Sequence, residues 1–195
     1  MARVMVVAAL LVGIVVSADA QRSQPREFSR VKQLGAALVE YHDGLTQAVA
    51  AYYHSQRNHD TPWLLIEVGV SSPQALVLRR DLVRLVSPSG QLVPLAAQRR
   101  WGADSARARG LLQEARTTRH QVRTYFRGTR GVELLRFFGR PEQGQTVIDI
   151  AQIAPEEVLL GDLLFESPTG AWERGIYALE IEHEGGTAAL PIELR

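Results

Sequence analysis

Short apolar segments separated by proline and glycine turns make up most of the chain from Trp63 onward, and this pattern constrains the fold most. In residues 63–70, alternate positions are leucine, isoleucine and valine, so one face of an extended chain would be apolar. Residues 71–73 (Ser-Ser-Pro) end this run. Further strand-like segments lie at residues 76–86, 91–95, 132–138, 146–150, 158–166, 177–183 and 187–194. Strands at this spacing predict a mainly β, antiparallel sandwich.

Some residues in these segments predict local features. Residues 79–81 (Arg-Arg-Asp) indicate a bend between two short strands. Pro94 predicts an edge strand, because proline cannot donate a hydrogen bond to a neighbouring strand. In the last part of the chain apolar and acidic residues alternate, so Glu180, Glu182 and Glu184 would line a solvated face.

An arginine-rich helix is predicted between the strands, over about residues 104–126, within an insertion that spans 99–131. Asp104 or Ser105 can cap its start. Apolar side chains recur at helical spacing and define one face, whereas the arginines lie away from it. The apolar positions are Ala108, Leu111, Leu112, Ala115, Val122 and Tyr125.

The segment before Trp63 fits two structures. Apolar residues recur at intervals of three and four over residues 31–52, which predicts a helix, whereas Asp43-Gly44 predicts a hairpin turn. We therefore treat residues 21–44 as an N-terminal extension, either helix or hairpin. A strand is favoured over a helix for residues 45–53, and a single sandwich domain would then span 45–195.

Residues 168–181, which read PTGAWERGIYALEI, contain a proline–glycine turn, a tryptophan and a Gly-x-Tyr-x-Leu strand. This pattern resembles the late strands of bacterial immunoglobulin-like sandwiches, at the C-terminal end of the chain only. The resemblance implies an immunoglobulin-like fold and no particular activity, because such sandwiches host unrelated functions. The helical insertion and the lack of a Cys–Trp–Cys framework depart from antibody-type domains.

The first twenty residues have the composition of a secretion signal. Arg3 gives a positive start, residues 4–16 form an uncharged apolar run, and residues 18–20 (Ala-Asp-Ala) suit a signal peptidase. The run is shorter than the roughly 20 apolar residues of a spanning helix. We therefore expect residues 1–20 to be cleaved near Ala20, leaving a protein exported to the periplasm or secreted. If they are kept, residues 4–18 would contact the membrane.

The net charge of +1 conceals two opposed blocks. Residues 99–140 contain eleven arginines and three acidic residues, whereas residues 141–195 contain two arginines and eleven acidic residues. The arginines either face solvent and pair with the protein's own acidic strands, or form a docking surface, since arginine binds carboxylates and phosphates in bidentate fashion. One tryptophan follows two arginines and precedes the helix, so it is expected near the surface. The candidate surface consists of Arg107, Arg116, Arg119, Arg123, Arg127 and Trp101.

No residue pattern nominates an enzyme. The chain has no Gly-x-Ser-x-Gly or Ser-x-x-Lys motif, no phosphate-binding glycine loop, a single lysine and no cysteine. His54, His59 and Asp60 share a polar segment, but their spacing matches no established pattern of metal ligands. We therefore expect no catalytic residues, no cofactor and no metal site.

These features predict an exported, non-catalytic binding or scaffold module of the cell envelope. Its partner would be another protein or an anionic envelope component, and nucleic acid is not expected outside the cytoplasm. The alternative is an accessory subunit of a membrane complex, anchored by an uncleaved N-terminal helix and docked through the arginine-rich segment. A third class, a secreted hydrolase or metal-dependent enzyme, has the least support.

Overall fold

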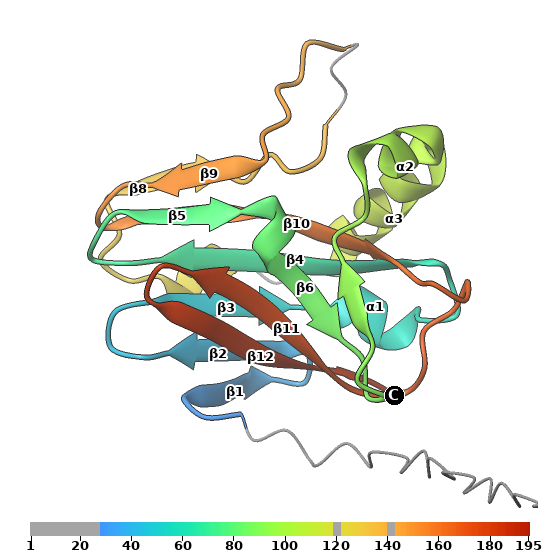
Figure 1. The fold of residues 1–195 in the computed structure, drawn as a ribbon, viewed down its shortest axis with the longest axis horizontal. Helices are drawn as coiled ribbons and strands as arrows, with labels where there is room; N and C mark the ends of the chain where they lie inside the picture. Colours follow the sequence, from blue (N-terminus) through green and yellow to red (C-terminus); the bar gives the residue numbers. More distant parts are fainter. Residues whose placement is uncertain (1–27, 119–121, 140–142) are drawn as a thin grey trace, which may run out of the picture.

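A computed structural model describes residues 28–118, 122–139 and 143–195 of the chain. The expected signal peptide at residues 1–20 and the candidate surface residue Arg119 lie outside these ranges. The described chain is mainly β, with mostly antiparallel open sheets, which confirms the mainly β and antiparallel part of the prediction (Figure 1). Within the described ranges, no helix combines the length and apolar character needed to cross a membrane.

The largest sheet has six strands, and all neighbouring pairs are antiparallel except β8 and β10, which run parallel. The N-terminal region forms a hairpin in this sheet, so the helix alternative is wrong. Leu38 and Val39, adjacent in sequence, are buried in clusters on opposite faces of the sheet, which is the period of a strand. The strand order is β1 (Val31–Gly35), β2 (Leu38–His42), β3 (Gln47–Ala51), β4 (Trp63–Ser71), β10 (Glu157–Glu166) and β8 (Gly131–Leu134).

A four-stranded sheet and a two-stranded sheet complete the β structure. The predicted bend between two strands is a 3-10 turn, η1 (Arg80–Leu82), and Pro94 lies on an edge strand as predicted. The four-stranded order is β12 (Gly186–Leu194), β11 (Gly175–His183), β6 (Val83–Val86) and β7 (Leu92–Pro94). The two-stranded sheet pairs β5 (Leu76–Arg79) with β9 (Ile150–Ile153).

Two predicted strands have wrong bounds. The strand expected at residues 146–150 is displaced to β9, which begins at Ile150. The strand expected at residues 132–138 ends at Leu134. There the side chain of Leu135 fills the space beside Gly161 that a Cβ would occupy, and the chain leaves the sheet.

The inner faces of the two larger sheets share the largest buried cluster. Ile66 and Leu163 contribute from the six-stranded sheet, and Leu85, Leu179 and Leu190 from the four-stranded sheet. Burying an aliphatic side chain of this size stabilises the fold by about 1.5–3 kcal/mol. In Figure 1, β6, β11 and β12 cross in front of the six-stranded sheet, so strands from distant parts of the sequence meet in this core.

Helical segments cover the outer face of the six-stranded sheet, where two further buried clusters lie. The first joins α2 (Gln98–Ala103) and α3 (Ser105–Thr118) to β4 and β10, and it contains Trp63, Leu65, Ala96, Trp101, Ala108, Leu111 and Leu164. The second joins the 3-10 turn η2 (Val122–Tyr125) to β2, β3 and β10, and it contains Leu38, Val49, Ala51, Val122, Phe126 and Val158. A short helix, α1 (Tyr53–Arg57), precedes β4.

The single helix predicted over residues 104–126 is instead two helices and a 3-10 turn. The first helix begins earlier, at Gln98, and Asp104 separates it from the next with φ −111° and ψ 27°. The Asp104 carboxylate accepts a hydrogen bond from the indole Nε1 of Trp63 at 2.7 Å, which ties this junction to β4. The apolar spacing nevertheless identified the buried face, because Ala108 and Leu111 are both buried.

Glu180 and Glu182 of β11, and Glu184 just after it, are not the evenly solvated row that the sequence predicted. Glu180 is only 8% exposed, and its carboxylate accepts a hydrogen bond from Arg84 Nε at 2.8 Å. Arg84 lies directly opposite Glu180 in the β6–β11 register and covers it. Glu182 lies 3.5 Å from the same guanidinium, and Glu184 is exposed.

Candidate functional site

A groove of about 1040 Å³ lies between α3 and the outer face of the six-stranded sheet. Its position follows from the pairing of β10. The Leu135 amide donates to the Leu160 carbonyl at 2.8 Å, and further along the strand the Ala96 amide donates to the Leu164 carbonyl at 2.9 Å. Asp162 lies between these two contacts and lines the groove. The groove therefore opens along the stretch of β10 between these two contacts, after the end of β8 and before the contact with the chain that follows β7.

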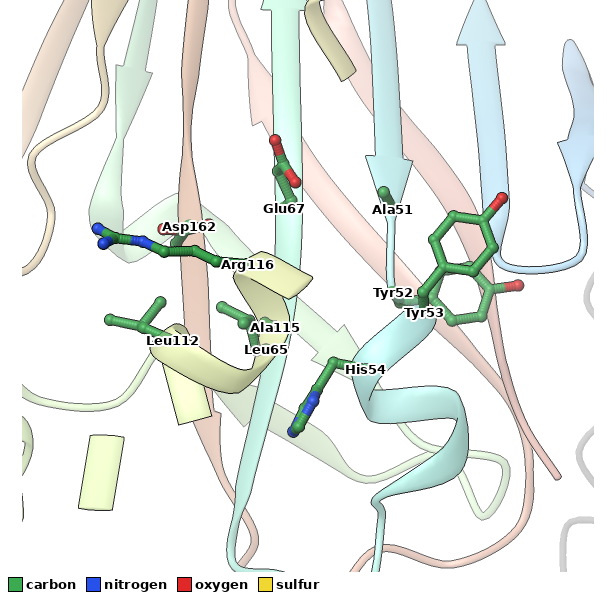
Figure 2. A pocket seen from close by; sticks show the side chains of 10 residues that line it. All are labelled: Ala51, Tyr52, Tyr53, His54, Leu65, Glu67, Leu112, Ala115, Arg116 and Asp162. Carbon is green, nitrogen blue, oxygen red and sulfur yellow. The ribbon is translucent and has the colours of Figure 1, made fainter. Parts of the chain in front are cut away.

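Two carboxylates lie next to each other on the floor of the groove. Glu67 of β4 and Asp162 of β10 are directly opposite in the antiparallel register, and both residues are half-buried. Like charges in this arrangement destabilise a sheet, so they favour cations close by. Arg116, from α3, lines the same hollow as Glu67 and Asp162 (Figure 2). The carboxylates thus form a polar strip between the two apolar clusters of this face.

A small hollow of about 30 Å³ lies next to the groove, with room for an ordered water (Figure 2). Glu67, Leu112, Arg116 and Asp162 line both spaces. His54 also lines the hollow, and burial lowers the pKa of its ring below the ordinary value. Among the residues that the structure describes, no group of three histidine or acidic side chains could hold a metal ion.

Exposed arginines surround the groove. Two come from α3, one from η2 and one from the segment after β8: Arg109, Arg116, Arg123 and Arg136. In the described part of the chain, none of these four forms an ion pair with a carboxylate. By contrast, Arg100 of the same charge block lies 2.6 Å from Glu166. The groove therefore gathers cations whose charge no described carboxylate neutralises at close range.

Part of the groove wall is apolar, and Arg80 contacts the segment that carries Phe138. Leu134 and Phe138 line it, and Leu134 exposes 59% of its surface. Arg80, from η1, donates hydrogen bonds to the carbonyl oxygens of Phe137 and Ala96. Its guanidinium also lies 4.4 Å from the centroid of the Phe138 ring, where the π face attracts a cation. Arg80 thus connects the segment that carries Phe138 to the chain before α2.

Trp101 lines the groove but is only 5% exposed. Its ring lies 6.4 Å from that of Phe138, centroid to centroid. No described residue accepts a hydrogen bond from its indole Nε1, which is buried. The prediction that Trp101 lies at the surface is wrong, because α2 was not predicted and turns the ring inward onto the cluster around Trp63.

Only some residues of the predicted docking surface line the groove. Arg116 and Arg123 line the groove, as does the buried Trp101. Arg107 and Arg127 are exposed but do not line it, and Arg107 lies 3.8 Å from Asp104. Arg119 falls outside the described residues.

Four charged residues of the groove were not predicted from the sequence: Glu67, Asp162, Arg109 and Arg136. The two acids carried a usable signal, because Glu67 is the one charged residue in the apolar run 63–70 and Asp162 is the one in 158–165. A charge inside a buried strand is costly unless other groups compensate it, so it indicates a special environment. Arg136 had no such signal, since its position depends on where β8 ends.

Comparison with known proteins adds no relative. No protein-family model, no curated protein and no solved structure matches the chain. A functional proposal therefore depends on the groove and on the sequence.

Proposed function

We propose that this protein is a non-catalytic binding module of the cell envelope that holds an anionic partner in the arginine-lined groove. The observation that carries the proposal is the set of four exposed arginines around one groove, none ion-paired with a described carboxylate. Guanidinium groups bind carboxylates and phosphates through paired hydrogen bonds. Because these arginines come from three separate segments, an anion in the groove can contact more than one of them.

The composition of residues 1–20 supports an exported location, in the periplasm or outside the cell. An exported protein without cysteine depends on packing rather than disulfides for stability. The large cluster between the two sheets is consistent with that requirement.

We further propose that the fold is immunoglobulin-like. Tyr177, at the start of β11, donates its phenol proton to the carbonyl oxygen of Glu173 at 3.1 Å, an arrangement like the tyrosine corner of such domains. Trp172 packs edge-on against this ring, with 5.8 Å between the two ring centroids. Burial and the nearby Glu173 carboxylate raise the pKa of Tyr177 to about 12, so the phenol remains a donor near neutral pH. The parallel β8–β10 pair departs from the usual antiparallel pattern.

The test of the docking proposal is binding to phosphatidylglycerol vesicles, with phosphatidylcholine vesicles for comparison. The triple variant Arg116→Gln, Arg123→Gln and Arg136→Gln removes three groove charges. Near an anionic surface each arginine contributes about 1 kcal/mol, so affinity should fall roughly fivefold per arginine removed. Binding of the unaltered protein should also weaken as salt rises.

The matched control is the triple variant Arg99→Gln, Arg107→Gln and Arg127→Gln. These exposed arginines belong to the same charge block but do not line the groove. The control variant should therefore lose less affinity than the groove variant. Equal losses in the two variants, or no loss in the groove variant, would contradict the proposal.

The second candidate function is an accessory subunit of a membrane complex. The apolar run at residues 4–16 favours it if the segment is retained, since it would then serve as an anchor. N-terminal sequencing of the protein purified from its native envelope separates the two functions. A chain that begins at Gln21 excludes the anchor, and a chain that begins upstream of residue 4 supports it.

A further inference from the structure

We infer that the ligand of the groove is a single-chain anionic amphiphile: a phosphate or carboxylate headgroup that carries an acyl chain. This inference rests on the proposed function and narrows it to a ligand class. It follows from the presence of two chemically different surfaces in one groove, exposed arginines and an apolar wall.

The apolar surface is suited to a hydrocarbon chain. Leu112, Leu135 and Leu160 are half-buried and line the groove together with Phe138 and the exposed Leu134. A water-filled groove leaves this surface wet, whereas a chain that covers it gains the hydrophobic contribution of the buried area. The groove volume of about 1040 Å³ is slightly above the range that small-molecule sites occupy, about 300–1000 Å³, so a ligand of that size fits.

The charged groups determine where the headgroup can lie. The exposed arginines attract an anion, whereas the carboxylate oxygens of Glu67 and Asp162 on the floor offer it no hydrogen-bond donor. The headgroup is therefore held among the arginines, away from the two carboxylates, and the chain lies along the apolar wall. Free phosphate would use only the arginines, and a neutral amphiphile would use only the wall.

Trp101 provides a built-in reporter. Its buried ring lines the groove beside Phe138, whereas Trp63 and Trp172 do not line it. A chain that packs against this part of the wall changes the surroundings of the Trp101 ring. Fluorescence should therefore respond to the amphiphile, and the response should disappear in the Trp101→Phe variant.

The experiment is a calorimetric titration with dodecyl phosphate, kept below its micelle-forming concentration. Inorganic phosphate and dodecyl maltoside are titrated in parallel, one without a chain and the other without a charge. We expect dodecyl phosphate to bind with one-to-one stoichiometry and at least about tenfold more tightly than either comparison compound. Binding no tighter than that of inorganic phosphate would overturn the inference.

Two leucine variants, one in the groove wall and one on the four-stranded sheet, distinguish binding in the groove from general hydrophobic adsorption. Leu134→Gln alters the groove wall, and Leu92→Gln alters a leucine of equal exposure on the four-stranded sheet, 59% against 60%. Both positions are exposed, so both variants should fold. The inference requires Leu134→Gln to weaken dodecyl phosphate binding about fivefold or more and Leu92→Gln to leave it unchanged. Equal effects would overturn it.

The results also separate the inference from the proposed function. If the groove arginines control vesicle binding while dodecyl phosphate binds no better than inorganic phosphate, the inference is wrong and the proposed function stands. If the groove arginines affect neither vesicle nor dodecyl phosphate binding, both are wrong.

Discussion

The two large sheets differ in what lies on their outer faces. On the six-stranded sheet, two buried clusters hold α2, α3 and η2 against the strands. The outer face of the four-stranded sheet carries no such cluster: among the described residues, the three buried clusters take only inward-facing side chains from this sheet. Leu92 and Ile176 remain 60% and 55% exposed there. The helical insertion has thus been added to one side of a core that both sheets share.

The arginines on the two outer faces also differ in whether they have carboxylate partners. On the four-stranded sheet, Arg84 lies between two glutamates, with Glu180 at 2.8 Å and Glu182 at 3.5 Å. Around the groove, the arginines have no such partner among the described residues. An arginine already neutralised by carboxylates gains little from another anion, whereas an arginine without one gains more. This contrast is a reason to place the proposed anionic ligand at the groove, on the face that carries the helices.

The largest effect on stability is expected from Trp63→Ala. Trp63 is fully buried under α2 and α3, and its indole donates to Asp104. The free energy of unfolding should fall by about 3–5 kcal/mol, measured by urea denaturation. Trp63→Phe keeps an aromatic ring and should cost less. A loss below about 1 kcal/mol in Trp63→Ala would show that the helices do not depend on this cluster.

An intermediate effect is expected from Glu180→Gln. This change removes the charge of a carboxylate that is nearly buried against Arg84 and should lower the free energy of unfolding by about 1–3 kcal/mol. Glu182→Gln is the control, since its side chain is 43% exposed and lies farther from Arg84, and it should cost no more than about 0.5 kcal/mol. Equal losses of unfolding free energy in the two variants would contradict the close pairing of Glu180 with Arg84 on the outer face of the four-stranded sheet.

The smallest effect is expected from Ile176→Thr, on the outer side of β11. Because Ile176 is more than half exposed, the free energy of unfolding should change by no more than about 0.5 kcal/mol. Ile181→Thr changes an inward-facing residue of the same strand, 1% exposed, and should cost more than about 1.5 kcal/mol. If both variants lowered the free energy of unfolding equally, some part of the protein would have to pack on the outer face of this sheet.

The strands could be predicted because alternate burial leaves a periodic pattern in the sequence. The predicted segment 158–166 corresponds to β10 (Glu157–Glu166), and 177–183 corresponds to most of β11 (Gly175–His183). Ala108 and Leu111 likewise identified the buried face of α3. In each of these elements, the period of the strand or helix alone determines which side chains face the core.

The groove could not be predicted in the same way, because it depends on contacts between distant segments. Glu67 and Asp162 become neighbours only through the β4–β10 register. Trp101 is buried by an unpredicted helix that packs on β4, which reversed the expected exposure of its ring. Arg136 reaches the groove because β8 ends two residues earlier, beside Gly161, and no local pattern indicates this end.

The position of β4 in its sheet has a consequence for the order in which the chain folds. Strands β1 to β4 are consecutive in both the sequence and the sheet, so they can pair early through local contacts. The other neighbour of β4 is β10, which begins at Glu157, long after β4 ends at Ser71. Closing such a long loop is slow, and until it closes β4 presents an apolar, unpaired edge that promotes aggregation. A factor that shields this edge should therefore raise the yield of refolding without changing the stability of the folded protein.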